Sequence, residues 1–546
     1  MELIKKNLGL IIVIILGAIP LFSLLHPGLP LTHDGQDHVA RIANFYQSLS
    51  EGNIIPRWAG NLDWGYGHPI LMFLYPFSSY AASFFHFLGF NFVDSLKIVF
   101  GLGFIASGIC MYIWLREFLG EKVAIAGATL YLYAPYRFVD LYVRGAIGEH
   151  MAFIFPPLIA YFLIKMVNKK SYWYFLGATL SIAGLILSHN ALLIMFLPII
   201  MIYGLYLILT NKKQSQRLII EYLLALLLGF SLSSFFIIPA FLEGKYTLRD
   251  IVTDGEVLKR FVQFKNIIYS PWGYGDFSVQ LGIAQWATII FFPFVIYKLK
   301  KNTNNLILYL IFFVYFLGSI VIMLPEAKLI WQVITTLQKF QFPWRFLSAS
   351  VFSAALLGSF FVFVLKKNVQ LLGVVLIVVF SIILTKTYWQ PKAYLMKPEA
   401  FYTGIYNGTT DTGESAPIWS VRFMENRPKA RIEVIEGKAT IKNVSRNSTE
   451  HVYTVVSNGN SGLRENTLFF PGWKVYIDGV EYQNVEFQDP HNRGLMTFKV
   501  PNGEHKVDIK FENTKLRTIS NVISLVSIAI VFLVYFVWKQ RIKKLT

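Results

Sequence analysis

Long apolar runs, each about the length of a membrane-crossing helix, recur along this chain of 546 residues. A helix needs roughly 20 predominantly apolar residues to cross the hydrocarbon core of a bilayer. Such runs stand at residues 8–25, 97–115, 123–140, 150–167, 173–188, 190–209, 218–241, 281–297, 305–324, 346–365, 369–386 and 518–538. The pattern therefore predicts a polytopic α-helical membrane protein with about 12 spans.

A further apolar stretch, residues 68–90, differs from these runs. It contains Pro69 and Pro76 together with tyrosines and two histidines. The basic clusters between the other runs can all face the cytoplasm only if this stretch does not cross the membrane. We therefore expect it to form a helix at the outer interface, and we expect both chain ends to be cytoplasmic.

Charge and composition agree with this class. Only 15% of the residues are charged and 55% are hydrophobic, and the formal net charge is +18. Clusters of lysine and arginine at the predicted cytoplasmic helix ends account for most of this excess, so it does not imply a nucleic-acid partner. These clusters are Lys5/Lys6, Lys169/Lys170, Lys212/Lys213/Arg217, Lys298/Lys300/Lys301, Lys366/Lys367 and Lys539/Arg541/Lys543/Lys544.

The polar segments that remain should lie on the outer side of the membrane. They comprise four loops and one larger block, at residues 26–96, 141–149, 242–280, 325–345 and 387–516. In the larger block, "PGWKVYIDGVEY" and "MTFKVPNGEHKVDIKF" alternate apolar and polar residues around Asp478-Gly479 and Asn502-Gly503, which are strong hairpin signals. This pattern predicts a small β-sandwich or jelly roll.

Three parts follow from this division. We expect a transmembrane domain over residues 1–386 and an extracytoplasmic β domain over 387–516. Residues 517–546 should form a final transmembrane helix with a basic cytoplasmic tail.

A cluster of charged residues, "LTHDGQDHVAR", follows the first apolar run. A spacing of four residues places Asp34 with His38, and Asp37 with Arg41, on shared faces of a helix. The simpler interpretation is a solvated helix start, because aspartate near a helix N-terminus is favoured by capping and by the helix dipole.

A second predicted outer loop, "YVRGAIGEH", adds Arg144, Glu149 and His150. Carboxylates from two loops, with imidazoles nearby, could bind a divalent cation such as Mg²⁺ or Mn²⁺. The candidate ligands are Asp34, Glu149 and His150. The alternative is an ion pair between Arg144 and Glu149 that holds the loop closed.

Taken together, these motifs resemble the GT-C superfamily of polyprenyl-phosphate-dependent glycosyltransferases. The resemblance rests on the outer acid after the first span, on "GNIIPRWAGNLDWGYGHPILMFLYP" and on "RGAIGEHMAFIF". With "FQFPWRF" (340–346) and "FFPGWKVYIDG" (469–479), the chain is also similar to bacterial and archaeal membrane proteins of the YfhO and 6-pyruvoyl-tetrahydropterin synthase-related types. A GT-C likeness implies transfer of a sugar from a polyprenyl-phosphate-linked donor to a glycan, lipid or protein acceptor outside the cell membrane.

The resemblance also implies roles for individual residues. Asp34 is the candidate base for the acceptor hydroxyl, and Asp37 is the second candidate because spacing does not rank the two. Glu149, with His150, would bind a metal or the sugar.

The leaving phosphate would be bound by Arg345, with Arg144 and Arg249 as alternates, because a guanidinium suits bidentate phosphate contacts. The other candidates for the substrate cavity are His38, Asp63, Trp64 and His68.

Two other functions fit the same sequence. A transporter or flippase for a lipid-linked substrate usually carries charged groups near the bilayer midplane and often has two similar halves, whereas here the charged clusters lie at helix ends. The other alternative is a non-catalytic membrane protein that binds a surface polymer.

Overall fold

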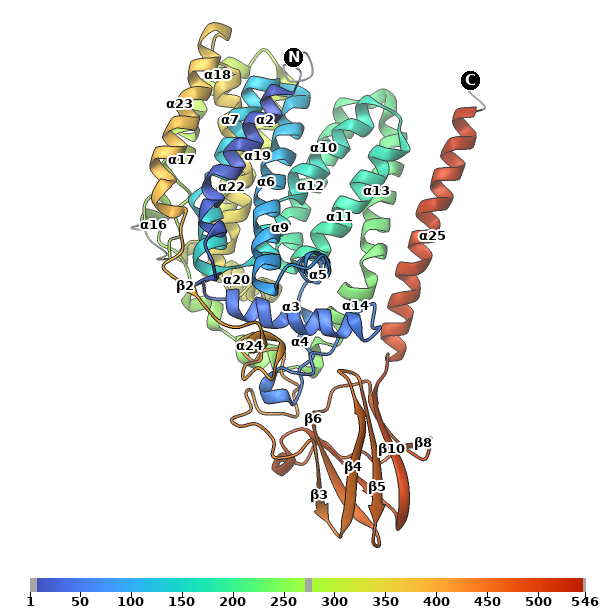
Figure 1. Ribbon diagram of the computed structural model, residues 1–546. Helices are drawn as coiled ribbons and strands as arrows, with labels where there is room; N and C mark the ends of the chain where they lie inside the picture. Colours follow the sequence, from blue (N-terminus) through green and yellow to red (C-terminus); the bar gives the residue numbers. More distant parts are fainter. Residues whose placement is uncertain (1–6, 271–276, 544–546) are drawn as a thin grey trace.

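A computed structural model describes residues 7–270 and 277–543. Long helices run side by side as a bundle, and a domain of β-strands lies at one end of it (Figure 1). We call this end the β end. The start of α2 (Leu8–Ala18) and the last turns of α25 (Lys515–Lys543) lie at the opposite end, which we call the far end (Figure 1).

The helices are, in chain order, α2 (Leu8–Ala18), α3 (Gly35–Ser50), α4 (Ile70–Phe73), α5 (Phe77–Phe87), α6 (Phe92–Leu119), α7 (Glu121–Leu132), α8 (Pro135–Phe138), α9 (Ile147–Ala152), α10 (Phe155–Asn168), α11 (Tyr172–Ser188), α12 (Asn190–Thr210), α13 (Ser215–Leu232), α14 (Ser234–Leu242), α15 (Arg249–Thr253), α16 (Phe264–Ile268), α17 (Ile283–Ile289), α18 (Phe292–Leu299), α19 (Thr303–Val321), α20 (Lys328–Val333), α21 (Thr335–Gln338), α22 (Leu347–Phe363), α23 (Lys367–Thr385), α24 (Ala400–Thr403) and α25 (Lys515–Lys543).

Within the described residues, 9 helical segments are long and apolar enough to cross a membrane. They are Leu8–Leu25, Phe92–Leu119, Ile147–Asn168, Asn190–Thr210, Lys212–Leu232, Thr303–Val321, Pro343–Phe363, Lys367–Tyr388 and Lys515–Lys539. The prediction of a helical protein with many membrane spans is thereby confirmed.

The structure differs from the predicted number of spans in two broken segments and one short one. The run 123–140 is broken because α7 ends at Leu132, and Ala134 takes an extended conformation before Pro135. The run 281–297 is divided into α17 and α18, with Pro293 in the first turn of α18. The helix in 173–188, α11, has 17 residues. Hydropathy alone does not detect such breaks, since the broken runs remain apolar throughout.

Residues 35–90 lie at the β end rather than crossing the bundle. Helix α3 lies across this end (Figure 1) and packs against α5 and α6. Its Val39, Ile42 and Phe45 are buried, so its apolar face is turned toward the other helices. Helices α4 and α5, which cover most of the stretch 68–90, are too short to be among the candidate spans.

The strands of the C-terminal domain form two antiparallel sheets. The orders are β4-β5-β10-β7-β8 and β3-β6-β9. Val455, Val475 and Val507 from the first sheet share one core with Leu463 and Phe498 from the second. This is the sandwich arrangement that the alternating pattern predicts. The strands are β3 (Ile432–Glu436), β4 (Ala439–Arg446), β5 (Glu450–Ser457), β6 (Ser461–Leu468), β7 (Trp473–Ile477), β8 (Val480–Tyr482), β9 (Leu495–Val500) and β10 (Gly503–Phe511).

Of the two predicted hairpins, one is confirmed and one is wrong. Asp478 and Gly479 have φ of +50° and +82° and join the paired strands β7 and β8, as a two-residue hairpin turn requires. Asn502 and Gly503 instead join strands of different sheets, because β9 pairs with β6 while β10 pairs with β5 and β7. A turn motif specifies only the local reversal, whereas the burial of each strand's apolar face decides its partner.

The segment between α23 and β3 packs on the β end of the bundle. Its short strand β2 (Tyr394–Leu395) pairs with β1 (Leu29–Pro30). Further along, the backbone N–H of Tyr406 donates to the carbonyl of Asn61, and that of Asp63 donates to the carbonyl of Gly408, both at 2.9 Å. This segment therefore covers the N-terminal loops, which bear the predicted site.

Candidate functional site

The two loops that carry the predicted acids are bonded directly to each other. The backbone N–H of His33 donates to the carbonyl of Val143 at 2.9 Å, and that of Asp34 donates to the carbonyl of Arg144 at 2.8 Å. Gly145 makes this approach possible, since its φ is +68° and a Cβ there would lie 2.4 Å from the hydroxyl oxygen of Thr32. Residues more than one hundred positions apart thus meet at one place.

A cavity of about 660 Å³ lies at this junction. Its lining comes from the start of α3, from the loop after α4 and from the end of the short helical segment Val139–Arg144. It also comes from α15 and the turns that follow it, from the turn before α22, and from the segment before β3. The charged or histidine residues in the lining are His33, Asp34, His38, Arg41, Arg144, Glu256, Arg260, Arg345, Asp411, Glu414 and Arg422.

The structure distinguishes the two aspartates that the sequence could not rank. Asp34 is exposed, lines the cavity, and its carboxylate makes no hydrogen bond within the described residues. Asp37 is not in the lining. Its carboxylate accepts a hydrogen bond from the Tyr406 hydroxyl at 2.7 Å, and burial raises its pKa. Of these two aspartates, Asp34 is therefore the one that a ligand in the cavity would meet.

His38 and Arg41 form a second pair on α3. Arg41 Nη1 lies 2.9 Å from His38 Nδ1. Since a guanidinium can only donate, Nδ1 accepts and the imidazole proton is on Nε2. Burial, and then the charge of Arg41, hold the pKa of His38 well below its usual value. Arg41 also donates to the hydroxyl and carbonyl oxygens of Thr410. The guanidinium is therefore positioned by His38 and Thr410, and not by Asp37 on the shared helix face.

Glu149 is fully buried in a network of ionic and polar contacts. Its carboxylate lies 2.7 Å from Arg144 Nη1 and 3.6 Å from Arg345 Nε. It also accepts hydrogen bonds from the hydroxyls of Tyr136 and, at 3.1 Å, Ser348. Arg144 makes a further ion pair with Asp140 at 2.6 Å. The ion pair between Arg144 and Glu149, which the sequence analysis left as an alternative, is thus present, and Glu149 does not line the cavity.

Guanidinium groups dominate the positive charge of the cavity. Five arginines and no lysine are found in its described lining. Two of the three predicted phosphate-binding residues, Arg345 and Arg144, are among them. Arg249 is not, because its guanidinium lies over the ring of Phe73, 5.1 Å from the centroid.

Aromatic rings form one wall. Trp344 stacks on Phe342 with centroids 4.6 Å apart and meets Phe277 edge-on at 5.0 Å. Arg144 lies over the Trp344 ring at 4.7 Å and Arg260 over the Phe342 ring at 4.6 Å. A flat apolar wall next to fixed cations is the kind of surface that holds both a sugar ring and a phosphate.

Three other predicted cavity residues lie elsewhere. Asp63 is buried, accepts a hydrogen bond from the backbone N–H of Met424 at 3.1 Å, and has its pKa raised to about 7 by burial. Trp64 packs on the core of the β domain. His68 is fully buried, and burial lowers its pKa to about 4. None of the three lines the cavity.

The predicted metal ligands do not form a ligand set. Across residues 7–270 and 277–543, no group of three or more His, Cys, Asp or Glu side chains is placed to hold a metal ion. His150 is enclosed by Phe100 and Phe104, and its Nε2 lies 3.0 Å from the carbonyl oxygen of Phe100. With Glu149 held by arginines as well, these residues do not fit a shared cation. The requirement for Mg²⁺ or Mn²⁺ stays a prediction.

Several lining residues were missed by the sequence analysis. Glu414 and Asp411 come from the segment before β3, where Asp411 accepts the backbone N–H groups of Gly413 at 2.8 Å and Ser415 at 3.0 Å. Gln341 and Thr410, also in the lining, have φ of +62° and +66°, which is a costly conformation for residues other than glycine. No sequence signal marks these positions, because they reach the cavity only through long-range packing.

Comparison with known proteins identifies the family. Residues 71–392 match the family described as "6-pyruvoyl-tetrahydropterin synthase related domain; membrane protein". The chain belongs to this family. It is also 27% identical, over 217 residues, to a protein from Lactococcus lactis subsp. cremoris (strain MG1363) whose description is "Uncharacterized protein". That match covers 38% of this chain and 35% of the relative's length.

One solved structure with partial similarity is the mycobacterial arabinofuranosyltransferase AftD. The match has 12% sequence identity and a TM-score of 0.40, and it covers 72% of this chain and 28% of that one.

Proposed function

We propose that this member of the family is a glycosyltransferase that moves a sugar from a polyprenyl-phosphate-linked donor to an acceptor on the extracytoplasmic face of the cell membrane. The observation that carries the proposal is the composition of the cavity at the β end. Of the four acids in its described lining, Asp34 alone has a carboxylate without a hydrogen bond or ion pair, and it shares the cavity with five guanidinium groups and an aromatic wall. These are the groups that transfer from a lipid phosphate requires.

The proposed reaction is a displacement at the anomeric carbon of the donor sugar. The acceptor hydroxyl oxygen forms the new C–O bond, its proton passes to the Asp34 carboxylate, and the bond to the phosphate oxygen breaks. The polyprenyl phosphate leaves with the electron pair of that bond. Arg345 and Arg144 meet the charge that develops on the departing phosphate.

The place of the cavity suits such a donor. It lies at the ends of the spans, where a phosphate can enter while its polyprenyl chain stays in the bilayer. Side chains of Leu74, Val252 and Phe277 in the lining provide apolar contacts for the first isoprene units. The acceptor, whether glycan, lipid or protein, would reach the cavity from the side of the β domain.

The membrane orientation belongs to the same proposal. Lys212 and Lys213 lie in the turn between α12 and α13, at the far end of the bundle, where the described chain also begins and ends (Figure 1). Basic clusters favour the cytoplasm. The β end, its cavity and the β domain would then be extracytoplasmic, and both termini cytoplasmic.

A transporter or flippase of a lipid-linked substrate is the second candidate. It is favoured by the buried group of Arg137, Asp140, Arg144 and Glu149, because charges inside a bundle often mark a translocation path. A scaffold that only binds a surface polymer would need neither this group nor an open carboxylate.

The experiment begins with mass spectrometry of the lipid that co-purifies with the protein. That lipid is then prepared with a labelled sugar and given to proteoliposomes containing the protein. A labelled covalent product supports the transferase, whereas movement of intact lipid across the bilayer without a product identifies a transporter and overturns the proposal.

Matched arginine variants test the assignment of the phosphate. Arg345→Gln should weaken binding of the lipid phosphate at least tenfold, in line with the loss of one charge-assisted contact of about 1.5–3 kcal/mol. Arg249→Gln removes the same charge outside the cavity and should leave binding unchanged. Equal loss in both variants would contradict the placement of the phosphate in this cavity.

A further inference from the structure

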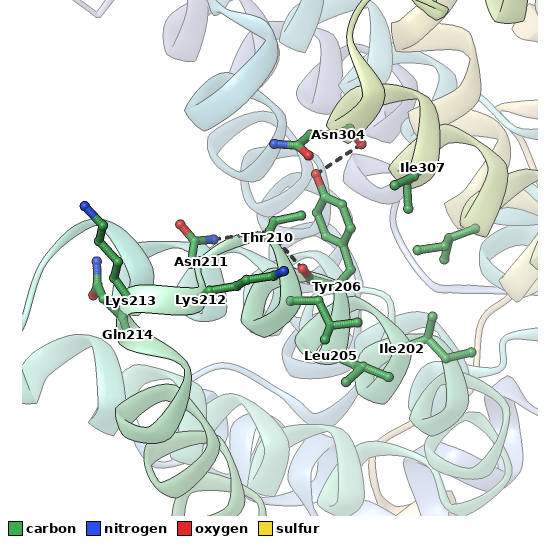
Figure 2. A pocket seen from close by; sticks show the side chains of 12 residues that line it. Ile202, Leu205, Tyr206, Thr210, Asn211, Lys212, Lys213, Gln214, Asn304 and Ile307 are labelled. Atoms are coloured by element: carbon green, nitrogen blue, oxygen red, sulfur yellow. Dashed lines mark hydrogen bonds between the residues drawn. The ribbon is translucent and has the colours of Figure 1, made fainter.

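A second cavity, of about 740 Å³, lies at the far end of the bundle. It is formed by the C-terminal half of α12, by the turn that leads into α13, and by the first turns of α19 (Figure 2). We call it the α12–α19 groove. It shares no lining residue with the cavity at the β end.

The helical part of this groove is apolar and open. Ile202, Leu205 and Leu209 of α12 and Ile307 of α19 line it, and between 42% and 59% of each residue is exposed. Both helices are candidate membrane spans. Side chains that are exposed on a membrane span face the hydrocarbon, so this part of the groove opens toward the acyl chains of the bilayer.

The end of the groove is basic. Lys212 and Lys213 are exposed, line the groove, and make no ion pair within the described chain. Figure 2 shows both lysines on the turn just beyond Thr210, where the Lys212 side chain extends toward Tyr206 and the apolar residues and Lys213 extends away from them. No acidic residue is present in its described lining. The groove therefore combines an uncompensated positive charge at the helix ends with an apolar channel along the helices.

Hydrogen bonds fix the shape of the groove near these lysines. The Tyr206 hydroxyl donates to the carbonyl of Asn304 at 3.3 Å and so links α12 to α19. Asn211 Nδ2 donates to the carbonyl of Leu207 at 2.8 Å, which orders the last turn of α12. The lysines are thus carried on an ordered turn next to a hollow.

We propose that the α12–α19 groove binds one anionic phospholipid. Its phosphate lies at the basic turn against Lys212, with Lys213 adding positive charge nearby, and an acyl chain lies along Leu205 and Ile307. A phosphate needs the cations and an acyl chain needs the apolar channel, and an anionic lipid supplies both groups. Basic pockets between membrane helices suit anionic head groups in the same way. The proposal does not depend on the proposed transferase activity.

Native mass spectrometry can test this proposal. The full-length protein in detergent is titrated with dioleoyl phosphatidylglycerol and, separately, with dioleoyl phosphatidylcholine. The wild-type protein should bind the first lipid at least tenfold more tightly. The double variant Lys212→Gln/Lys213→Gln should lose roughly 25-fold in affinity for phosphatidylglycerol, at roughly fivefold per lysine. Its affinity for phosphatidylcholine should not change.

Two further variants separate the parts of the groove. Lys366→Gln/Lys367→Gln removes the same charge from another basic cluster, whose residues do not line the groove, and should leave phosphatidylglycerol binding unchanged. Leu205→Trp fills the apolar channel and should weaken binding of both lipids. Because Leu205 is exposed to the membrane, this change should not disturb folding.

Three results would overturn the proposal. One is equal affinity of the wild-type protein for the two lipids. Another is an equal loss of phosphatidylglycerol binding in the two lysine double variants, which would show only a general attraction to charge. The third is unchanged binding in Leu205→Trp together with displacement of phosphatidylglycerol by inorganic phosphate, which would show that a free anion and not a lipid occupies the site.

Discussion

Asp34 and Glu149 were both candidates for catalysis, and the structure places them in opposite surroundings. Asp34 is exposed to a cavity and its carboxylate has no hydrogen-bond donor within the described residues. Glu149 is fully buried and its two oxygens are shared among Arg144, Arg345 and two hydroxyls. Both acids lie at helix starts at the same end of the bundle, Asp34 just before α3 and Glu149 in the first turn of α9.

We expect the two acids to have different roles because their surroundings differ. A carboxylate that exchanges a proton with a substrate must be reachable, and Asp34 is. A carboxylate between two arginines cannot easily take a proton, but it can hold their guanidinium groups at the cavity edge. We therefore expect Asp34 to act on the substrate and Glu149 to position Arg144 and Arg345.

The largest effect should follow from Asp34→Asn, which keeps the shape of the side chain and removes its charge. Loss of a general base typically lowers the rate 10²–10⁴-fold, and we expect that range for sugar transfer in proteoliposomes. Binding of the donor lipid should survive, because its phosphate is assigned to arginine. Full transfer activity in Asp34→Asn would show that Asp34 is not the general base, and its exposure would then give it no catalytic role that Glu149 lacks.

Glu149→Gln should act on stability. The change removes the carboxylate that pairs with Arg345, whereas Arg144 keeps its ion pair with Asp140. The free energy of unfolding should therefore fall by about 3 kcal/mol, which is the low end of the range for breaking a buried ion pair. Thermal unfolding in detergent measures this loss. The control Ser348→Ala removes one neutral hydrogen bond to Glu149 and should cost only about 1 kcal/mol. A Glu149→Gln protein as stable as the wild type would show that the arginines do not need this acid.

Asp63 extends the comparison to a buried acid that makes no ion pair within the described residues. Burial raises its pKa from 3.8 to about 7, so the folded protein binds this proton more tightly than the unfolded chain. Its stabilising contribution is complete below the unfolded pKa and is lost as the pH rises toward about 7. Between about pH 5 and pH 7 the loss should be roughly 2 kcal/mol.

The measurement is the melting temperature of the wild type and of Asp63→Asn across this pH range. The melting temperature of Asp63→Asn should fall much less than that of the wild type over this range, because asparagine does not titrate. If wild type and variant decline in parallel, another group is responsible.

Asp37→Asn should have the smallest effect. An asparagine oxygen can still accept the hydrogen bond from Tyr406, so we expect a loss of about 1 kcal/mol in stability and nearly normal sugar transfer. The same transfer assay checks it, at matched protein levels. An inactive Asp37→Asn protein with an active Asp34→Asn protein would exchange the roles of the two aspartates.

Much of the fold follows from local patterns in the sequence. Apolar runs near 20 residues long have one stable solution in a bilayer, which is a helix, because every backbone polar group must be bonded internally. Alternation in residues 469–511 likewise determined which side chains of β7 and β10 are buried, and Asp478-Gly479 determined the turn between β7 and β8. These features depend on neighbours within a few residues.

The partners of Asp34, Glu149 and Asn502-Gly503 depend on residues far away in the chain. Arg345 comes close to Glu149 only because the turn before α22 packs beside α9, and Thr410 reaches Arg41 only because the segment before β3 covers α3. The pairing of β10 with β5 rather than β9 is also a long-range choice. The sequence by itself determined the helices, most of the strands and the residues able to do chemistry. Only the tertiary structure decided which acid stays open and which is neutralised, because burial and ion pairing are properties of the assembled surroundings and not of local spacing.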